Sequence, residues 1–273
     1  MKLLKKVLVL LLVGGVVSGV VWTIREKQTR LFPPTAEFGE ARKPLKFAVM
    51  ADVHSDWGNF KIAIEKAKKD ESEFVIIAGD LTTIGKKEEF LEAKKILDES
   101  GLKYYVIPGN HDIWWGRRFK QNLWGEVFEK SFMSFNIEDK KFILVNNGDG
   151  ENGLEASGGQ EEWLRREVEE CLKAYCLVFL HEPLNHPTSS HIMGEENLAV
   201  ATQAAQLVKL LVKNKVEQIF AGHLHFSSSY ELEDLKTTIV GAITSERNFQ
   251  SPKFLEVSAL EETISKKEIF LDD

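Results

Sequence analysis

Five apolar segments of this chain each end at a side chain that can bind a metal ion. The segments are rich in β-branched and aromatic residues, and they span residues 45–51, 74–78, 103–107, 175–180 and 216–221. In an open α/β sheet, the loops beyond the carboxyl ends of the strands share one edge and form the ligand crevice. We therefore expect the side chains that follow these five segments to meet at one edge of a sheet.

The side chains after the segments form short motifs of Asp, Asn and His. In chain order the motifs are Asp52-Val53-His54, Gly79-Asp80, Gly109-Asn110-His111-Asp112, His181 and Gly222-His223-Leu224-His225. Metal ions that hydrolyse phosphate esters take oxygen and imidazole ligands, and a pair of them can clamp the attacking and leaving oxygens. This ligand set suits manganese, iron or zinc, and the lack of cysteine ligands argues against a purely structural zinc site. Five of the seven histidines lie in the motifs, which argues against ordinary surface histidines.

Strand-like and helix-like segments alternate along the chain. Helical spacing occurs at residues 60–69, 86–99, 160–173 and 200–213. The alternation predicts βαβ units in a parallel or mixed sheet. Residues 132–137 and 141–146 predict a hairpin, and the short strands predicted after His225 suggest a second sheet packed on the first.

The first residues of the chain predict a membrane-targeting segment. Residues 7–22 carry no charge, follow a start that contains three lysines, and extend to eighteen residues with Thr23 and Ile24. A spanning helix needs roughly 17–25 apolar residues. We therefore expect a retained anchor at residues 1–24; a cleaved signal peptide is the alternative, with a weak site at Val17-Ser18-Gly19.

The anchor is expected to be followed by a linker at residues 25–44, which is polar and rich in proline, and by a globular domain at residues 45–273. Basic residues flank the apolar segment on both sides, so the positive-inside rule is nearly balanced. Because the basic start resembles an export signal, we expect the domain to lie outside the cytoplasm.

Composition adds two constraints. The net charge is −7, which argues against nucleic-acid binding, because such proteins usually carry a basic surface. Cys171 and Cys176 are expected to be buried free thiols, and a disulfide is the alternative if the domain is exported.

The order of the five motifs resembles that of the calcineurin-like metallophosphoesterase family over residues 45–225. The resemblance implies an α/β fold in which two mixed β-sheets pack as a sandwich flanked by helices, in four layers (α/β/β/α). It also implies hydrolysis of phosphomonoesters or phosphodiesters by attack of a metal-bound hydroxide at a dinuclear site.

Matching motif to motif implies two metal positions that share Asp80 as a bridge. The first would be held by Asp52, His54, Asp80 and His225. The second would be held by Asp80, Asn110, His181 and His223. The ions implied are manganese, iron or zinc.

His111 would face the leaving group as an acid or a hydrogen-bond donor. Some family members carry an Asp three residues after the bridging Asp, where it orients this histidine. This chain has Thr83 there, so Asp112 either takes that catalytic supporting role or is a turn residue. The chain also has Pro108, where the serine/threonine protein phosphatase branch has Arg, and we do not assign it to that branch.

Three further parts of the chain lie near the motifs, and two of them leave two interpretations open. Residues 113–118, which contain Trp114, Trp115 and two arginines, suit a phosphate-bearing apolar substrate or a membrane surface, or else form a packed loop. His186 and His191 either contact substrate or face solvent. In the Gly- and Asn-rich residues 147–159, Asp149 and Glu151 could suggest a calcium site, but their spacing fits no EF-hand. We therefore expect these residues to be a solvated loop.

The sequence therefore predicts a membrane-anchored, two-metal phosphoesterase. The narrower alternative is a pyrophosphatase or phosphodiesterase that acts on a lipid-linked or nucleotide substrate. A catalytically silent scaffold for protein binding is disfavoured, because the full ligand set and His111 remain.

Overall fold

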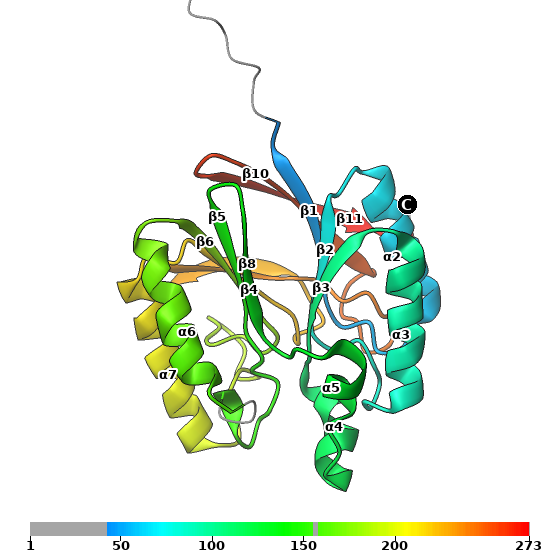
Figure 1. Ribbon diagram of the computed structural model, residues 1–273, viewed down its shortest axis with the longest axis horizontal. Coiled ribbons are helices and arrows are strands. Elements are labelled where there is room, and N and C mark those ends of the chain that lie inside the picture. The colour runs from blue at the N-terminus through cyan, green and yellow to red at the C-terminus, as the bar shows by residue number, and fades with distance from the viewer. Residues whose placement is uncertain (1–42, 155–157, 273) are drawn as a thin grey trace, which may run out of the picture. The chain divides into compact units, whose positions relative to one another are not determined.

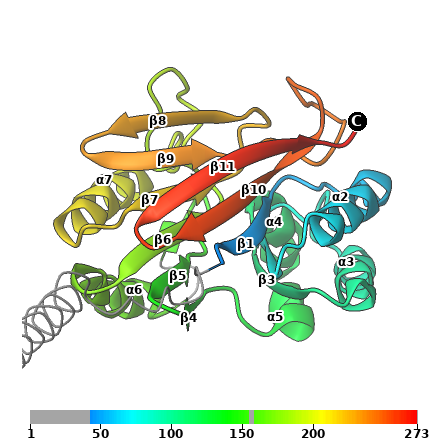
Figure 2. The ribbon, with the colours of Figure 1, turned by 90° about the horizontal axis from the view of Figure 1, so that it is seen from above.

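Two β-sheets lie face to face at the centre of the structure, and helices cover their outer faces (Figures 1 and 2). The computed structural model describes residues 43–154 and 158–272. The predicted anchor and residues 25–42 of the predicted linker lie outside this part of the chain. Within the described residues, no helix has both the length and the apolar character needed to cross a membrane.

The first sheet combines a parallel centre with an antiparallel edge. Its strands in spatial order are β11 (Thr263–Phe270), β10 (Lys253–Leu260), β1 (Leu45–Met50), β2 (Phe74–Ala78) and β3 (Lys103–Ile107). β1, β2 and β3 are parallel, and β10 pairs with β1 in the antiparallel sense. The helices α2 (Trp57–Lys69) and α3 (Lys87–Ser100) connect these parallel strands. The carboxyl ends of β1, β2 and β3 therefore lie at the same edge of the sheet.

The second sheet has the same mixed character. Its strands in spatial order are β4 (Met133–Ile137), β5 (Lys140–Leu144), β6 (Tyr175–Leu180), β7 (Gln218–Ala221), β9 (Leu235–Ile239) and β8 (Ser228–Leu232). The four inner strands are parallel, and β4 and β8 close the sheet as antiparallel edges. The predicted hairpin at residues 132–146 is confirmed as β4 and β5.

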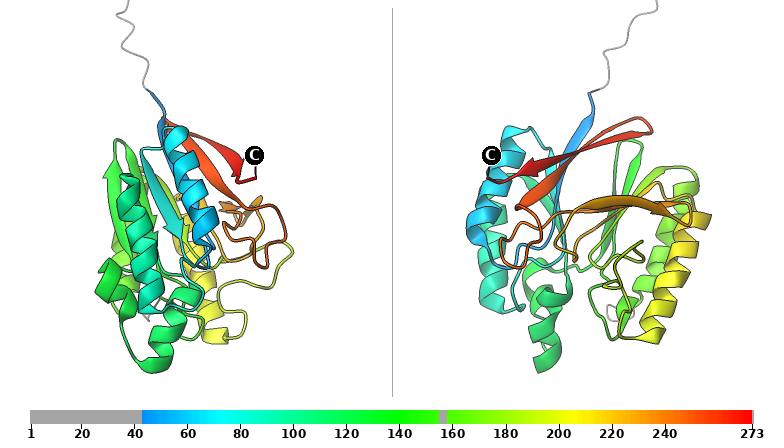
Figure 3. Two further views of the ribbon diagram at one scale, coloured as in Figure 1. Left: turned by 90° about the vertical axis from the view of Figure 1, so that its right-hand side faces the viewer. Right: turned by 180° about the vertical axis from the view of Figure 1, so that it is seen from behind.

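Helices flank both sheets and complete the predicted four layers. α2 and α3 cover the first sheet, while α6 (Gln160–Glu169) and α7 (Leu198–Lys213) cover the second (Figures 1 and 3). Two further helices, α4 (Asn110–Phe119) and α5 (Leu123–Phe128), follow β3 directly, and a short 3₁₀ turn, η2 (Glu170–Leu172), follows α6. α2 begins one turn earlier than its apolar pattern predicts, because Asp56 caps it by accepting from the Asn59 amide.

The strands are buried on both faces, which explains why their sequences are nearly continuous apolar segments. Along β1, Phe47 and Val49 point between the sheets, whereas Ala48 and Met50 point toward the helices. The space between the sheets is filled by phenylalanine rings, including the stacked pair of Phe47 and Phe74, whose centroids are 5.1 Å apart. Burying one such ring contributes roughly 1.5–3 kcal/mol.

The strands after His225 correct one expectation. They do not form a separate sheet: β8 and β9 extend the second sheet, whereas β10 and β11 extend the first. β1 pairs with β2 along one edge only, and its other edge offers free backbone groups that β10 takes up. Side-chain alternation shows that a segment is a strand, but it does not specify which edge the strand will join.

The two cysteines correct a second expectation. Cys171 of η2 and Cys176 of β6 are joined in a disulfide, and their Cα atoms are 5.4 Å apart. This separation lies in the range that a disulfide requires. The expectation of two free thiols was wrong because sequence spacing does not show that the turn before β6 brings the two residues together.

We predict that the disulfide stabilises the domain modestly, because it closes a short loop whose cross-linking removes about 2 kcal/mol of unfolded-state entropy. Urea unfolding of the native protein should shift to lower denaturant when reductant is added. The Cys171→Ala/Cys176→Ala variant is the control, since reductant should leave its midpoint unchanged. Equal midpoints for the native protein with and without reductant would contradict the prediction.

Candidate metal centre

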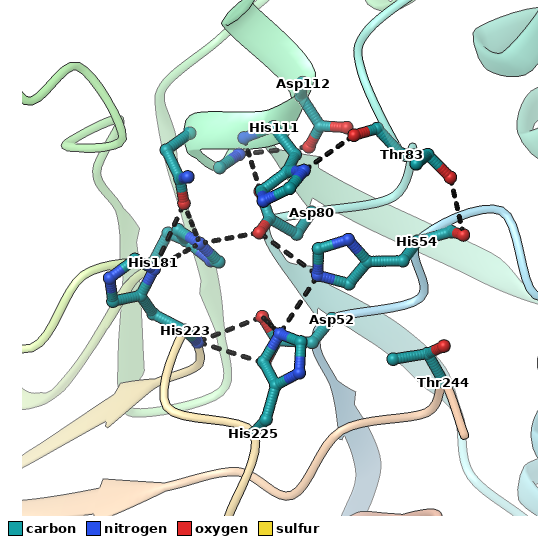
Figure 4. A network of polar contacts seen from close by, with 12 residues as sticks. Asp52, His54, Asp80, Thr83, His111, Asp112, His181, His223, His225 and Thr244 are labelled. Carbon is teal, nitrogen blue, oxygen red and sulfur yellow. Dashed lines mark hydrogen bonds and ion pairs between the residues drawn. The ribbon is translucent and has the colours of Figure 1, made fainter. Parts of the chain in front are cut away.

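The seven predicted ligands come together at the edge where the two sheets meet (Figure 4). The first sheet supplies the ligands that follow β1, β2 and β3. The second sheet supplies the histidines that follow β6 and β7. A β-bridge between Ala51 and Ala242 fixes the end of β1 against the loop that leaves the second sheet. The site therefore depends on the packing of the sheets as well as on each strand.

Asp80 lies between two groups of side chains. Its Oδ1 accepts a hydrogen bond from the His111 amide at 2.9 Å. Its Oδ2 faces His54 Nε2 at 3.4 Å and His181 Nε2 at 3.2 Å. One carboxylate oxygen thus contacts a histidine from each group, which is the arrangement that a bridging ligand requires.

The first group contains Asp52, His54 and His225. His54 Nε2 and His225 Nε2 are 3.1 Å apart, and His225 Nε2 lies 3.7 Å from Asp52 Oδ1. The carboxylate of Asp52 also accepts from the His223 amide at 3.0 Å. This hydrogen bond ties the first group to the backbone of the second.

The second group contains Asn110, His181 and His223. Asn110 Oδ1 lies 3.0 Å from His181 Nε2 and 3.1 Å from His223 Nδ1. The two histidine nitrogens are 3.3 Å apart. The His181 Nδ1–H donates to the Ala78 carbonyl at 2.9 Å, so Nε2 is the nitrogen that faces the group and is left for a metal ion.

The chemistry of these contacts fits two cations. Lone pairs of His181, Asn110 and Asp80 converge in one group, and two imidazole nitrogens and a carboxylate converge in the other. Buried acceptors that face one another repel unless a proton or a cation lies between them. Asp52, Asp80, Asn110 and the four histidines are therefore the residues that would hold two metal ions.

The backbone at the ligands is unusual. Five of them have positive φ angles, between 47° and 73°: Asp52, His54, Asp80, His223 and His225. Left-handed backbone costs of order 1–3 kcal/mol for a non-glycine residue and persists where the surroundings enforce it. Here the amides of Val53 and His54 donate to the Asp80 carbonyl at 2.8 and 3.0 Å, so one strand end holds the next in this conformation.

Burial and mutual charge shift the pKa values of the ligands in the absence of metal. Burial raises the pKa of Asp52 to about 8 and lowers that of His54 to about 4. Burial also acts to raise the pKa of Asp80, but His181, His54 and His111 hold it well below its ordinary value. For His181, burial favours the neutral form, yet Asp80 raises the pKa to about 10.

Two glycines allow the close approach of these groups. Gly79 has a φ of +88°, and a Cβ there would lie 2.4 Å from His181 Nδ1. A Cβ on Gly109 would lie 2.2 Å from Asp80 Oδ1. Both positions exclude any larger residue unless the ligands move.

Asn147 supports His181, and the sequence analysis missed this role. Its Oδ1 accepts from the His181 amide at 2.9 Å and the Glu182 amide at 3.2 Å, and its Nδ2 donates to the Glu182 carbonyl at 2.7 Å. Residues 146–149 are buried, so the expectation of a solvated loop was wrong for this end of it. The available signal was the strand before it, because β5 is parallel to β6 and ends at the same edge.

His111 is oriented by the backbone. The His111 Nδ1–H donates to the Thr83 carbonyl at 2.6 Å, and the ring packs edge-on against His54 with centroids 4.5 Å apart. Thr83 occupies the position at which some family members carry an orienting Asp. In this chain the backbone carbonyl of Thr83 orients the His111 ring instead. Because Nδ1 carries the hydrogen, Nε2 is the nitrogen left for a substrate.

Asp112 does not contact the His111 ring, contrary to the orienting role considered for it. Its buried carboxylate accepts from the amides of Leu81, Thr82 and Gly109 and from the Thr82 hydroxyl, at 2.7 to 3.1 Å. It lies in the first turn of α4, where a carboxylate favours the helix start. Asp112 therefore joins the loops after β2 and β3 and positions the backbone that carries Asn110 and His111.

The tryptophan- and arginine-rich segment forms α4 rather than a loop. Trp115 packs against the helix side of the first sheet, whereas Trp114 is 41% exposed. Arg118 lies over the Trp114 ring, and Arg117 pairs with Asp149 and Glu151. His191 stacks on the ligand His223 at 4.2 Å between centroids, while His186 contacts Phe226 and Tyr230.

A four-layer sandwich with two ligand groups that share one carboxylate defines a dinuclear metallophosphoesterase fold and site. Residues 45–227 match the calcineurin-like phosphoesterase family, and the chain belongs to this family.

Its relatives include proteins named as probable phosphodiesterases and a probable purple acid phosphatase. A probable glycerophosphodiester phosphodiesterase of Arcobacter nitrofigilis is 32% identical over 64% of the chain and 64% of its own length. A probable cyclic nucleotide phosphodiesterase of Fibrobacter succinogenes is 24% identical over 67% of the chain and 68% of its own length. The match thus spans a little under two thirds of the length of the first relative and slightly over two thirds of the length of the second.

Solved structures show the same fold. A dimetal phosphatase of Danio rerio superimposes with a TM-score of 0.61 at 13% identity, over 84% of this chain and 97% of that one. The purple acid phosphatase PPD1 of yellow lupin (Lupinus luteus) gives a TM-score of 0.62 at 14% identity, over 86% of this chain and 52% of that one.

We predict that Asp80→Ala abolishes metal retention at one or both positions, because each ligand group loses its shared oxygen. Metal analysis after loading with Mn²⁺ should find about two ions per native chain and about one or fewer in the variant. Asp98→Ala, which removes an exposed carboxylate on α3, is the matched control. An Asp80→Ala protein that keeps its full metal content would contradict the bridging role.

Metal affinity should rise with pH. In the metal-free protein, His181 and Asp52 have pKa values of about 10 and about 8, so both hold protons at neutral pH and a metal ion must displace them. Each displaced proton weakens binding by up to about tenfold per pH unit of acidification below these pKa values. Calorimetric titration with Mn²⁺ near pH 6 and near pH 8 measures the effect, and equal affinities would contradict it.

Proposed function

We propose that the chain is a metal-dependent hydrolase of phosphodiesters. The proposal rests on one observation. Asp80 Oδ2 lies 3.4 Å from His54 Nε2 and 3.2 Å from His181 Nε2, so one oxygen atom contacts both ligand groups. Two ions held there would lower the pKa of a coordinated water and neutralise charge on the phosphate. The relatives named as probable phosphodiesterases support diesters as the substrate class.

His111 is proposed as the residue that assists the leaving group. Its Nδ1–H is fixed by the Thr83 carbonyl, and its backbone amide is fixed by Asp80. The ring therefore has one orientation, with Nε2 directed away from the Thr83 loop. When Nε2 is protonated, it donates a hydrogen bond, and then the proton, to the departing alcohol oxygen.

Manganese is the ion we propose for reconstitution, with iron and zinc as the other ions that this set of oxygen and imidazole ligands accepts. Metal analysis of the protein as purified from its own cells would identify the resident ions. Isolation of a chain that binds none of the three would contradict the proposal.

The proposed function is tested with the Mn²⁺-loaded full chain on bis(p-nitrophenyl) phosphate and on p-nitrophenyl phosphate. Hydrolysis of the diester in preference to the monoester is expected, and activity on neither would refute the proposal. His111→Ala should keep both metals but lower kcat about 10²–10⁴-fold, the usual scale of general acid–base help. Metal loss in this variant would overturn the role of His111.

We also propose that the domain acts outside the cytoplasm, tethered by the apolar segment near its start. The Cys171–Cys176 disulfide supports this location, because stable disulfides are typical of oxidising compartments. Digestion of intact cells with a protease that cannot cross the membrane tests this location. A domain that is protected from the protease until the cells are lysed would contradict the proposal.

A further inference from the structure

A pocket of about 410 Å³ opens beside the second ligand group. Asn110 and His223 form its inner wall, and α4 and the loops after β5 and β6 form the rest. The loop after β6 packs against the metal ligands, since the His191 ring stacks on His223. An ester whose phosphate lies at the metal ligands would therefore place one of its alcohol portions in this pocket.

The two basic side chains in the pocket already have acidic partners. Arg117 lies 3.3 Å from a carboxylate oxygen of Asp149 and 3.6 Å from one of Glu151. His191 Nδ1 lies 2.6 Å from a carboxylate oxygen of Glu195. Neither is left as an unpaired positive charge for a second anionic group of a substrate.

Glu182 is the buried acidic side chain of the pocket. It is only 6% exposed and lines the pocket. Asn147 fixes its backbone on both sides of the residue. Among the described residues, no hydrogen bond or ion pair reaches its carboxylate. Because this side chain lines the pocket, an ammonium group of a ligand bound there would lie against it.

The remaining wall suits a cation with apolar substituents. Trp114 lines the same pocket and is 41% exposed. Arg118 already lies over this ring, so Trp114 offers chiefly apolar contact for the substituents of a bound cation. The exposed carboxylate of Glu196, at the rim of the pocket, adds negative potential and disfavours a second phosphate.

We propose that this pocket binds an ammonium-bearing alcohol portion of a phosphodiester, with Glu182 as the residue that recognises the cation. The inference rests on the proposed phosphodiesterase function and adds the substrate class: diesters of amino alcohols, in preference to neutral diesters and to nucleotide polyphosphates. Glu182 is thereby a specificity residue and has no part in the hydrolytic step.

The sharpest test compares two ligands that differ only in charge. Phosphocholine carries a quaternary ammonium, and 3,3-dimethylbutyl phosphate replaces the nitrogen by carbon. The Mn²⁺-loaded full chain should bind phosphocholine at least about tenfold tighter by calorimetry, which equals about 1.4 kcal/mol. Equal affinities, or tighter binding of the neutral compound, would overturn the proposal without recourse to any variant.

Glu182→Gln then assigns the preference to one residue. It should reduce the affinity ratio to about one, and change binding of the neutral compound less than about threefold. Glu88→Gln, which removes an exposed carboxylate on α3 outside the pocket, is the matched control and should keep the ratio. Equal weakening of both ligands, or a lower Mn²⁺ content, would show that Glu182 acts through its neighbour His181, and would overturn its role in recognition.

Kinetics on the matching diesters separates this inference from the proposed function. With p-nitrophenyl phosphorylcholine and its neutral 3,3-dimethylbutyl isostere, Glu182→Gln should raise KM for the cationic diester alone and leave kcat for both nearly unchanged. If neither these diesters nor bis(p-nitrophenyl) phosphate is hydrolysed, the proposed function fails, and the two binding constants still decide whether the pocket selects a cation.

Discussion

The buried carboxylate of Asp80 is the contact on which the metal centre depends. One oxygen is held by the His111 amide at the start of α4, and the other faces one histidine from each sheet, His54 after β1 and His181 after β6. The ligand groups therefore keep their spacing only if the two sheets stay packed. The phenylalanine layer between the sheets is in this sense part of the site, because it helps to fix the distance between the ligands of the first sheet and those of the second.

The strand ends also hold one another in costly conformations. Left-handed backbone at five ligands is enforced by hydrogen bonds between neighbouring loops, such as those from Val53 and His54 to the Asp80 carbonyl. Asp112 and Asn147 add a second set of contacts. The Asp112 side chain binds backbone groups of the loops after β2 and β3, and the Asn147 side chain binds the backbone of His181 and Glu182. The ligands are thus oriented before any metal binds, which reduces the reorganisation that binding requires.

The structure separates chemistry from recognition. Short loops at the strand ends carry the ligands and His111, and their geometry leaves little freedom for change. The longer loops after β5 and β6, together with α4, form the pocket beside the second ligand group and carry its acidic side chains. Substrate preference can therefore vary with these loops while the metal ligands stay in place, as is common where a rigid scaffold presents variable loops.

The sequence by itself determined which Asp, Asn and His side chains can meet, because apolar strands that end at these residues place them at the carboxyl edge of a parallel sheet. The sandwich fold and the division of the ligands between two metal positions were implied by the resemblance to the metallophosphoesterase family. The sequence also placed His111 next to the ligands. The tertiary structure alone decided which edges β8 to β11 join, that Cys171 pairs with Cys176, and that the Thr83 carbonyl, rather than Asp112, orients His111. Each of these depends on contacts between segments distant in sequence or on the path of a turn, and residue patterns carry no information about such distances.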